Sequence, residues 1–235
     1  MTSQINTTRK INKDVKLDQT KSELIKVSTS FYQRGWMLGT SGNLSILIEE
    51  NPLQFLITVS GKDKGELTED DFILVNESGV IARSNSDEAI SIGIASPSAR
   101  NDTSSVKPSA ETLLHSAIYK HVGAKAVFHV HTTNSTLLSM KSGDKIIFSD
   151  LEMLKGLGLK THDVKITIPI IENSQDMKYL ATIAPNYINE DVPGLLLKGH
   201  GIYAWGKSPQ EAKRHVEIFE FLFEYRMKEL ALEKM

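Results

Sequence analysis

The sequence predicts an α/β fold in one large domain. Short apolar runs typical of strands alternate along the chain with longer segments of helical pattern, and no internal repeat interrupts this order. The 235 residues suit one domain, and 40% of them are hydrophobic, which is enough for a substantial core. The polar residues 1–18 are expected to form a flexible arm, and residues 19–235 the folded domain.

Composition argues against several classes of protein. The net charge of -2 provides no basic surface for nucleic acid or for a membrane. No apolar run approaches the roughly 20 residues that span a bilayer, and the N-terminus lacks the apolar region of a signal peptide. The chain has no cysteine, so disulfides and thiolate metal sites are excluded and a cytoplasmic protein is expected. Any transition metal must therefore be bound by His, Asp or Glu.

The first half of the chain is expected to contain one helix followed by four strands. Apolar residues such as Leu24 and Phe31 predict a helix from Lys21 to near Gly35. The apolar runs that follow are short and are separated by turn residues. The predicted strands cover residues 44–48, 55–59, 72–75 and 80–82. Residues 84–106 are rich in Ser, Asn, Asp and Pro, and a stretch this long is expected to be disordered or to have a role of its own.

The second half alternates strands with helices. Pro108 precedes a predicted helix over residues 109–121. Ser208 and Pro209 form a clear helix start, with a capping hydroxyl and a proline at the first helical position. The remaining predicted strands cover residues 126–130, 166–171 and 195–197, and the remaining helices cover residues 132–140, 174–188 and 208–231.

Three histidines have the spacing of a metal site. His129 and His131 occupy alternate positions of a predicted strand, so their side chains face the same side about 6.6 Å apart. Both imidazoles can then reach one ion with Zn–N bonds of about 2.0–2.1 Å, while Phe128 points to the opposite face. His200 is the best candidate for a third ligand, because it follows a second apolar strand and lies between two glycines. Three protein ligands leave one position open for water or substrate, as in catalytic zinc sites.

Two glutamates are candidates for the base that metal-assisted proton abstraction requires. Glu111 lies in the first turn of a predicted helix, where an acid can alternatively serve the helix dipole or a capping box. Glu152 lies between apolar residues and can alternatively belong to the solvated face of a short helix. His115 lies one helical turn after Glu111, so these two side chains share a face.

Small hydroxyl-bearing turns beside the strands suggest a phosphorylated ligand. Backbone N–H groups in residues 40–45 and in Ser60-Gly61-Lys62 can converge on an anion, and the Lys62 side chain can add positive charge. Ser109, at a helix N-terminus, offers a third set of donors. Each turn alone is an ordinary structural feature, and only the combination with a metal site indicates phosphate.

The order of these motifs resembles the class II aldolase/adducin family over about residues 20–230. The longer matching segments are SGKDKGELTEDDF (60–72), KPSAETLLH (107–115), FHVHTTNST (128–136), LEMLKGL (151–157), IPIIENSQD (168–176) and KGHGIYAWG (198–206). The resemblance implies a single catalytic domain with a central, mainly antiparallel sheet flanked by helices on both sides. It also implies a ring-like homotetramer with sites near the subunit boundaries.

Carried over residue by residue, the family's site falls on motifs already described. The zinc ligands correspond to His129, His131 and His200, with one zinc ion per subunit. The acid/base corresponds to Glu152, whereas in the related aldolases that role belongs to the position of Glu111, which can also contact the metal and substrate. The phosphate-binding residues of the aldolases correspond to Gly42, Asn43, Ser60, Gly61 and Ser109. Ala110 replaces the second serine of the aldolase pattern and removes one hydroxyl donor.

The resemblance implies an enzyme that acts on a small sugar phosphate. The segments around Glu152 and Asn173 favour removal of water from 5-methylthioribulose 1-phosphate, a step of methionine salvage, which gives 2,3-diketo-5-methylthiopentyl 1-phosphate. One alternative is an aldolase that cleaves fuculose or rhamnulose 1-phosphate at the same kind of metal site. A second is a non-enzymatic, adducin-like binding module, which is expected to lack the three histidines.

Overall fold

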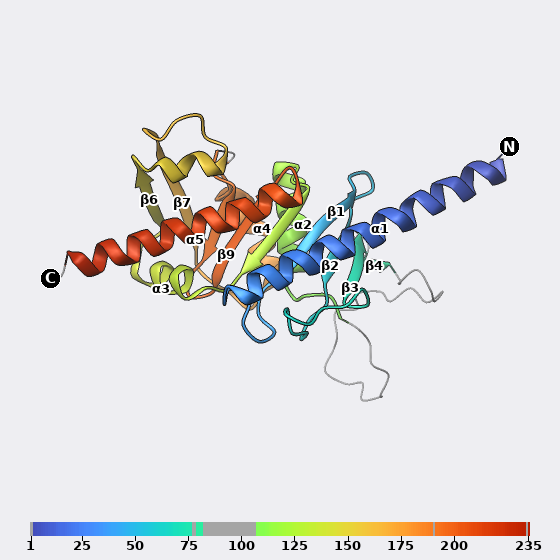
Figure 1. The fold of residues 1–235 in the computed structure, drawn as a ribbon, viewed down its shortest axis with the longest axis horizontal. Helices are drawn as coiled ribbons and strands as arrows, with labels where there is room; N and C mark the ends of the chain where they lie inside the picture. The colour runs from blue at the N-terminus through green and yellow to red at the C-terminus, as the bar shows by residue number, and fades with distance from the viewer. Residues whose placement is uncertain (1, 77–78, 82–106, 190, 234) are drawn as a thin grey trace.

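The computed structural model describes residues 2–76, 79–81, 107–189, 191–233 and 235. The predicted loop at 84–106 lies outside this range, as does Ala82 at the end of a predicted strand. In chain order, the described elements are α1 (Thr2–Gln33), β1 (Asn43–Glu49), β2 (Gln54–Thr58), β3 (Phe72–Asn76), β4 (Gly79–Ile81), α2 (Thr112–Val122), β5 (Ala126–Val130), α3 (Thr133–Lys141), β6 (Lys145–Ser149), the 3₁₀ helix η1 (Glu152–Leu157), β7 (Lys165–Ile171), α4 (Met177–Ile183), the 3₁₀ helix η2 (Ala184–Asn186), β8 (Gly194–Leu197), β9 (Gly201–Gly206) and α5 (Pro209–Leu232) (Figure 1).

The strands of the described chain form one nine-stranded sheet in the order β4-β3-β2-β1-β5-β9-β8-β7-β6. Neighbouring strands are antiparallel except β7 and β8, which are parallel. This confirms the predicted α/β class with a mainly antiparallel sheet. The central strand is β5, which pairs with β1 on one side and with β9 on the other.

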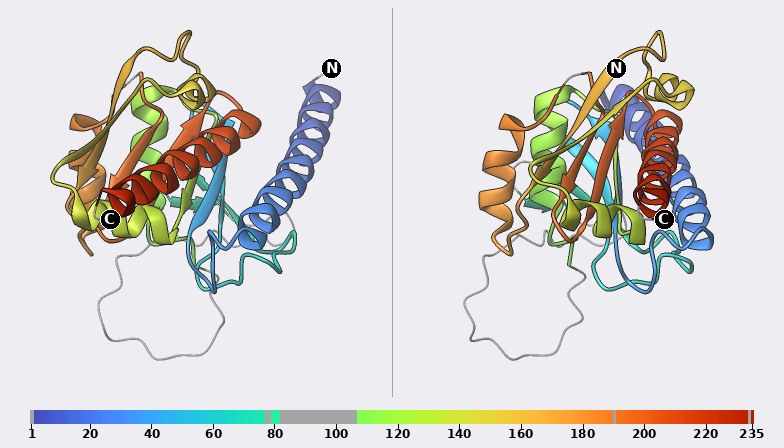
Figure 2. Two further views of the ribbon diagram at one scale, coloured as in Figure 1. Left: turned by 60° about the vertical axis from the view of Figure 1, so that its left-hand side comes forward. Right: turned by 90° about the vertical axis from the view of Figure 1, so that its left-hand side faces the viewer.

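Helices cover both faces of the sheet, and each face has its own hydrophobic core. One core contains Phe31 of α1 and Phe219 of α5. The other contains Leu114 of α2 and Leu180 of α4. The right-hand view of Figure 2 shows α1 and α5 on one side of the sheet and α2 and α4 on the other. The predicted arrangement of helices on both sides is therefore confirmed.

The side chains of β5 point alternately to the two faces of the sheet, so this one short strand contributes to both cores and to the functional site. Ala126, Phe128 and Val130 are fully buried on the α1/α5 face. Val127 lies on the opposite face, in the core under α2 and α4, and His129 shares that face because side chains alternate along a strand. Phe128 packs edge-on against Phe31 with ring centroids 6.0 Å apart, which fixes β5 against α1. His129 is thus attached to a rigid, buried strand.

The structure differs from the prediction at several elements. The first helix begins at Thr2, so the residues predicted to be a flexible arm belong to α1. The helix predicted from 109 begins at Thr112, and the one predicted from 174 begins at Met177, where the Asp176 side chain accepts hydrogen bonds from two backbone N–H groups. Strands β6 and β9 were not predicted, and helix η1 corresponds to the short helix considered as an alternative for Glu152. No helix in the described ranges is both long and apolar enough to cross a membrane.

Candidate metal centre

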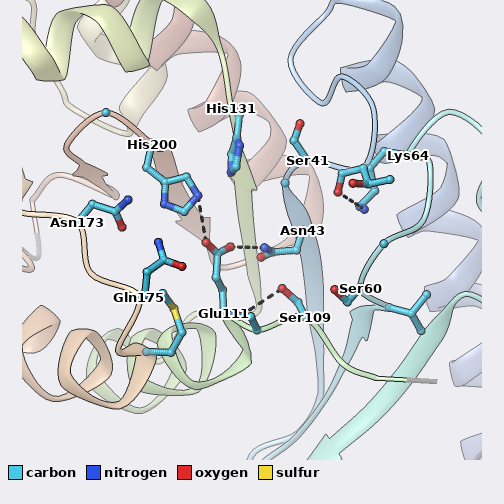
Figure 3. A pocket seen from close by; sticks show the side chains of 17 residues that line it. Ser41, Asn43, Ser60, Lys64, Ser109, Glu111, His131, Asn173, Gln175 and His200 are labelled. Carbon is cyan, nitrogen blue, oxygen red and sulfur yellow. Dashed lines mark hydrogen bonds and ion pairs between the residues drawn. The ribbon is translucent and has the colours of Figure 1, made fainter. Parts of the chain in front are cut away.

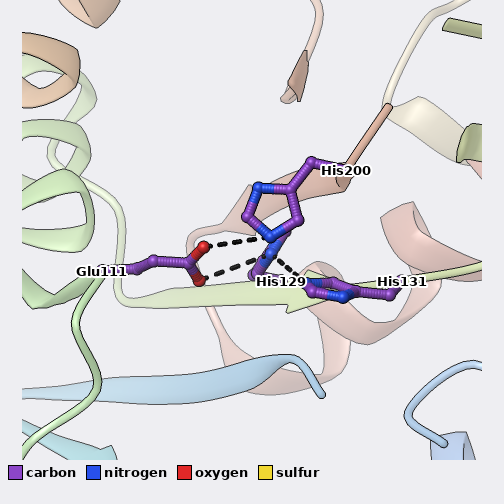
Figure 4. Close-up of side chains that lie close together, drawn as sticks. All are labelled: Glu111, His129, His131 and His200. Atoms are coloured by element: carbon purple, nitrogen blue, oxygen red, sulfur yellow. Dashed lines mark hydrogen bonds and ion pairs between the residues drawn. The ribbon is translucent and has the colours of Figure 1, made fainter. Parts of the chain in front are cut away.

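Four side chains converge at one end of the central strands (Figure 4). Their ligand atoms all lie within 4.8 Å of one another, and they belong to Glu111, His129, His131 and His200. Glu111 directly precedes α2, His129 and His131 lie in β5 and just beyond it, and His200 lies in the turn between β8 and β9. The structure thus brings the three predicted ligands together and adds Glu111 to them.

The turn that carries His200 depends on glycine. Gly199 has a φ of +65°, in the left-handed region that glycine adopts most readily. Gly201 begins β9 so close to β5 that an added Cβ would lie 2.2 Å from the Val130 carbonyl oxygen. These two glycines therefore allow the turn to place His200 over the end of β5.

The tautomer of His129 is set by the backbone. Its Nδ1 lies 3.0 Å from the carbonyl oxygen of Ile202, which can only accept, so Nδ1 carries the proton. The Nε2 lone pair then faces the cluster, where the Nε2 atom of His131 lies 2.7 Å away. The His129 ring also stacks on Tyr203 with centroids 3.9 Å apart. A backbone carbonyl acceptor is a usual means of orienting a metal-binding imidazole, and the contact with Tyr203 further restricts this ring.

The electrostatics keep His129 and His131 neutral. Burial, followed by the neighbouring His131 and His200, holds the pKa of His129 well below its usual value. Burial lowers the pKa of His131 to about 4, and His200 and Lys64 add to the shift. Neutral imidazole is the form that binds metal ions.

The donor set fits a divalent metal ion. Glu111 Oε2 lies 3.4 Å from His129 Nε2, and Glu111 Oε1 lies 3.2 Å from His200 Nε2. Bonds of about 2.0–2.1 Å at tetrahedral angles separate ligand atoms by roughly 3.3 Å, so these two spacings match a first coordination shell. The 2.7 Å between the Nε2 atoms of His129 and His131 is shorter, and these two rings must move slightly apart to share an ion. Three imidazoles and a carboxylate suit several transition metals. These four side chains therefore form a candidate metal site.

A series of hydrogen bonds through buried side chains orients Glu111. The amide of Asn43 donates to Glu111 Oε2, and the amide oxygen of Asn43 accepts from His115 Nε2. With its proton on Nε2, His115 accepts at Nδ1 from the Ser45 hydroxyl, 2.7 Å away. The Tyr119 hydroxyl, 2.7 Å from Ser45 Oγ, then donates to that serine. Each group in the series donates to the next one towards Glu111, and the Glu111 carboxylate is the final acceptor.

This series of hydrogen bonds requires a neutral His115, so the free energy of unfolding should fall in acid. Burial lowers the pKa of His115 to about 3, against about 6.5 in an unfolded chain. Because the folded pKa is depressed, the stabilisation is complete above about pH 6.5 and is lost as the pH falls towards about 3. Between pH 7 and pH 5, metal-free wild type should lose about 2 kcal/mol more unfolding free energy than His115→Gln. Urea unfolding at the two pH values measures this, and equal losses would contradict it.

A cavity of about 390 Å³ opens beside the cluster (Figure 3). Its lining includes nearly all of the predicted phosphate-binding residues, namely Gly42, Asn43, Ser60, Gly61, Ser109 and Glu111. Lys62 is not among them. Its side chain is 56% exposed and its ammonium lies 3.0 Å from a carboxylate oxygen of Asp71. The Lys62 side chain is therefore directed away from the cavity that its own loop helps to form.

Several lining residues were not singled out from the sequence. Lys64 is the most notable, because it is buried and is nevertheless among the residues that line the cavity. Asn173, Gln175 and Met177 reach the cavity from the segment that follows β7. The sequence signals were present, as a second lysine in the 60–72 segment and as two amides in the 168–176 segment. Neither signal distinguishes a buried side chain from an exposed one.

Glu152 is the one predicted catalytic residue that lies apart from the cluster. It begins η1, its side chain is 71% exposed, and its carboxylate pairs with Lys155 at 2.7 Å and faces His162 at 3.7 Å. Strand β7 ends at Ile171, next to the cavity, and β6 pairs antiparallel with it. Strand β6 therefore runs away from the cavity, and Glu152 follows its far end. Within one chain, Glu152 and the histidines lie at opposite ends of the sheet.

Comparison with known proteins identifies the family. Residues 22–227 match the model of the class II aldolase and adducin N-terminal domain. The chain is 42% identical over 213 residues to methylthioribulose-1-phosphate dehydratase of Bacillus subtilis (strain 168), covering 90% of this chain and 93% of that protein. It is 43% identical over 201 residues to the Persephonella marina protein of the same name, covering 85% of each.

Solved structures agree on the fold. The l-fuculose-1-phosphate aldolase of Thermus thermophilus superposes with a TM-score of 0.70 over 93% of this chain and 99% of that one, at 21% identity. That likeness supports the architecture alone, whereas the family model and the dehydratases cover most of the sequence as well. The chain therefore belongs to the class II aldolase and adducin family, and within it resembles the methylthioribulose-1-phosphate dehydratases.

Proposed function

We propose that this protein removes water from 5-methylthioribulose 1-phosphate and yields 2,3-diketo-5-methylthiopentyl 1-phosphate, a reaction of methionine salvage. The observation that carries the proposal is the Glu111–His129–His131–His200 cluster at the wall of a cavity lined by small anion-binding loops. Similarity to the dehydratases over most of the chain indicates which reaction this site performs.

We propose that His129, His131 and His200 hold one zinc ion per subunit. When bound there, zinc supplies positive charge that stabilises negative charge developing on substrate oxygens. Glu111 lies beside His129 and His200 and is oriented by Asn43. It is our candidate for a second catalytic carboxylate, one that contacts the metal or the substrate.

The phosphate group would be bound by the loops that face the cluster across the cavity. Gly42 and Gly61 have φ values of +72° and +74°, a conformation that lets successive backbone N–H groups turn towards one point. Asn43, Ser60 and Ser109 would add side-chain donors. Binding the phosphate there positions the other end of the sugar near the histidines, which supplies the orientation that catalysis needs.

The proton transfers are assigned to Glu152. Its carboxylate takes the proton from C3, and the resulting carboxylic acid returns a proton to the C4 hydroxyl, which leaves as water. The enol formed between C3 and C4 then tautomerises to the diketone, so that the product differs from the substrate by one molecule of water.

Because Glu152 lies at the far end of its own sheet, this assignment requires that it enter the site of a neighbouring copy. A head-to-tail ring, such as the expected homotetramer, provides that arrangement. The cytoplasmic location remains a prediction.

The direct test is to incubate the purified protein with enzymatically prepared 5-methylthioribulose 1-phosphate, with and without a chelator. We expect diketone to form and the chelator to stop it, with activity restored by added zinc. An aldehyde product would instead indicate aldol cleavage of the same substrate class. No product from metal-loaded protein would reject the proposed substrate and direct the search to other ketose 1-phosphates.

A further inference from the structure

Lys64 is a buried cation between the two loops that face the metal cluster. The residue is 1% exposed. Its ammonium donates to the carbonyl oxygen of Thr40 at 3.1 Å and to that of Lys62 at 2.8 Å. One carbonyl belongs to the loop before β1 and the other to the loop after β2, so a single side chain connects both loops.

The main chain of Lys64 is itself anchored. Its carbonyl oxygen accepts a hydrogen bond of 2.6 Å from the Ser28 hydroxyl, which is fully buried on α1. The ammonium is therefore held from two sides, through the helix that supports its backbone and through the loop carbonyls that it contacts. Little freedom remains for it to move towards solvent.

The charge of this ammonium is not neutralised by contact. Among the described residues, no carboxylate lies within ion-pair distance of Lys64, and both of its hydrogen-bond acceptors are neutral carbonyls. Asp63 and Asp71 act on it only through the longer-range field. A cation removed from water without a counter-ion costs free energy. An ammonium has three donors, so the two carbonyls leave one N–H on a residue that lines the cavity.

We propose that Lys64 is the cationic residue of the phosphate subsite, and that it holds the two loops at the spacing at which their N–H groups surround the phosphate. The inference rests on the proposed function for the nature of the ligand, a phosphate monoester dianion. That ligand supplies the missing counter-charge, and its oxygens accept from the free N–H of Lys64. Burial lowers the pKa of Lys64, which is the cost that the bound dianion offsets.

Lys62 provides the matched control. It lies two residues away in the same segment, but it is exposed and its charge is paired with Asp71. The same substitution at the two positions therefore separates a buried, uncompensated charge from a solvated, paired one.

The experiment measures binding of inorganic phosphate to metal-loaded wild type, Lys64→Met, Lys64→Arg and Lys62→Met by calorimetry, together with the metal content of each. We expect Lys64→Met to raise the dissociation constant by roughly 10- to 100-fold, as for loss of a charge-assisted contact, with unchanged metal content. Lys62→Met should change it less than about threefold, and Lys64→Arg should retain measurable binding. A dissociation constant in Lys64→Met within about twofold of wild type would overturn the proposal.

A second measurement covers the case in which Lys64→Met does not fold. In the NMR spectrum of wild type labelled with ¹⁵N at the lysine side chains, the Lys64 ammonium signal is identified as the one that the Lys64→Arg spectrum lacks. Saturating phosphate should shift that signal. No shift would overturn the proposal. Phosphate binding does not depend on turnover, so Lys64-dependent binding without diketone would reject the proposed function alone. Diketone formation with Lys64-independent binding would reject this inference alone.

Discussion

Replacing His129 with alanine should abolish metal binding and turnover together. His129 is fully buried, its Nδ1 proton is committed to Ile202, and its Nε2 faces both Glu111 and His131. Partners in the second shell of a metal site are typically worth 10- to 100-fold in affinity or activity, so loss of a direct ligand should exceed about 100-fold. The variant should also lose the stacking on Tyr203.

The measurement is metal content per chain after dialysis, followed by the rate of diketone formation. His121→Ala is the control, because that imidazole is exposed and lies outside the cluster. Full metal occupancy in His129→Ala would reject this residue as a ligand. Loss of metal in both variants would point to general destabilisation instead.

Replacing Glu152 with glutamine should have the opposite signature, with the metal retained and turnover lost. The side chain is exposed and remote from the histidines of its own chain, so the amide should not disturb the cluster. A general acid/base typically contributes about 10²- to 10⁴-fold, and a loss in that range is expected. Glu224→Gln is a matched control, since Glu224 is also an exposed partner of a lysine, at 2.6 Å from Lys228. Wild-type turnover in Glu152→Gln would show that another group is the base.

Mixing the two inactive variants tests where Glu152 acts. If Glu152 serves a neighbouring copy, co-expressed His129→Ala and Glu152→Gln chains form some sites with an intact metal centre from one chain and an intact glutamate from the other. Activity should then reappear, although each variant alone is inactive. No recovery from a demonstrated mixed assembly would contradict the transfer of Glu152 between copies.

Much of the fold could be read from local sequence signals. The apolar run at 126–130 coincides with β5, and the capping pair Ser208 and Pro209 begins α5. The missed strand β6 contains the short apolar run Ile146-Ile147-Phe148, so a local signal was present there. The missed strand β9 lacked a clear signal. Strand β9 is buried at every position and interrupted by glycine at both ends, so it shows no alternation. The first residues of α1 are polar and show no apolar period, which is why an arm was predicted there.

In the site too, the residues that could be predicted are those whose placement depends on local geometry. The i,i+2 histidines and the glycine-flanked His200 could be predicted because strand and turn geometry are local. The choice between Lys62 and Lys64 could not, because it depends on which side chain the packing of α1 buries. Nor could the distance of Glu152 from the histidines, because it follows from the direction of β6 in the sheet.

The central position of β5 has a consequence for how the molecule opens. The strands before it in the chain, β1 to β4, all lie on one side of it, and the later strands, β6 to β9, all lie on the other. Glu111 comes from the earlier half, His200 from the later half, and the other two ligands from β5 or its end. An ion bound there is a cross-link between the two halves of the chain. Its binding free energy therefore opposes separation of the sheet along β5, and has less effect on fraying of the outer strands.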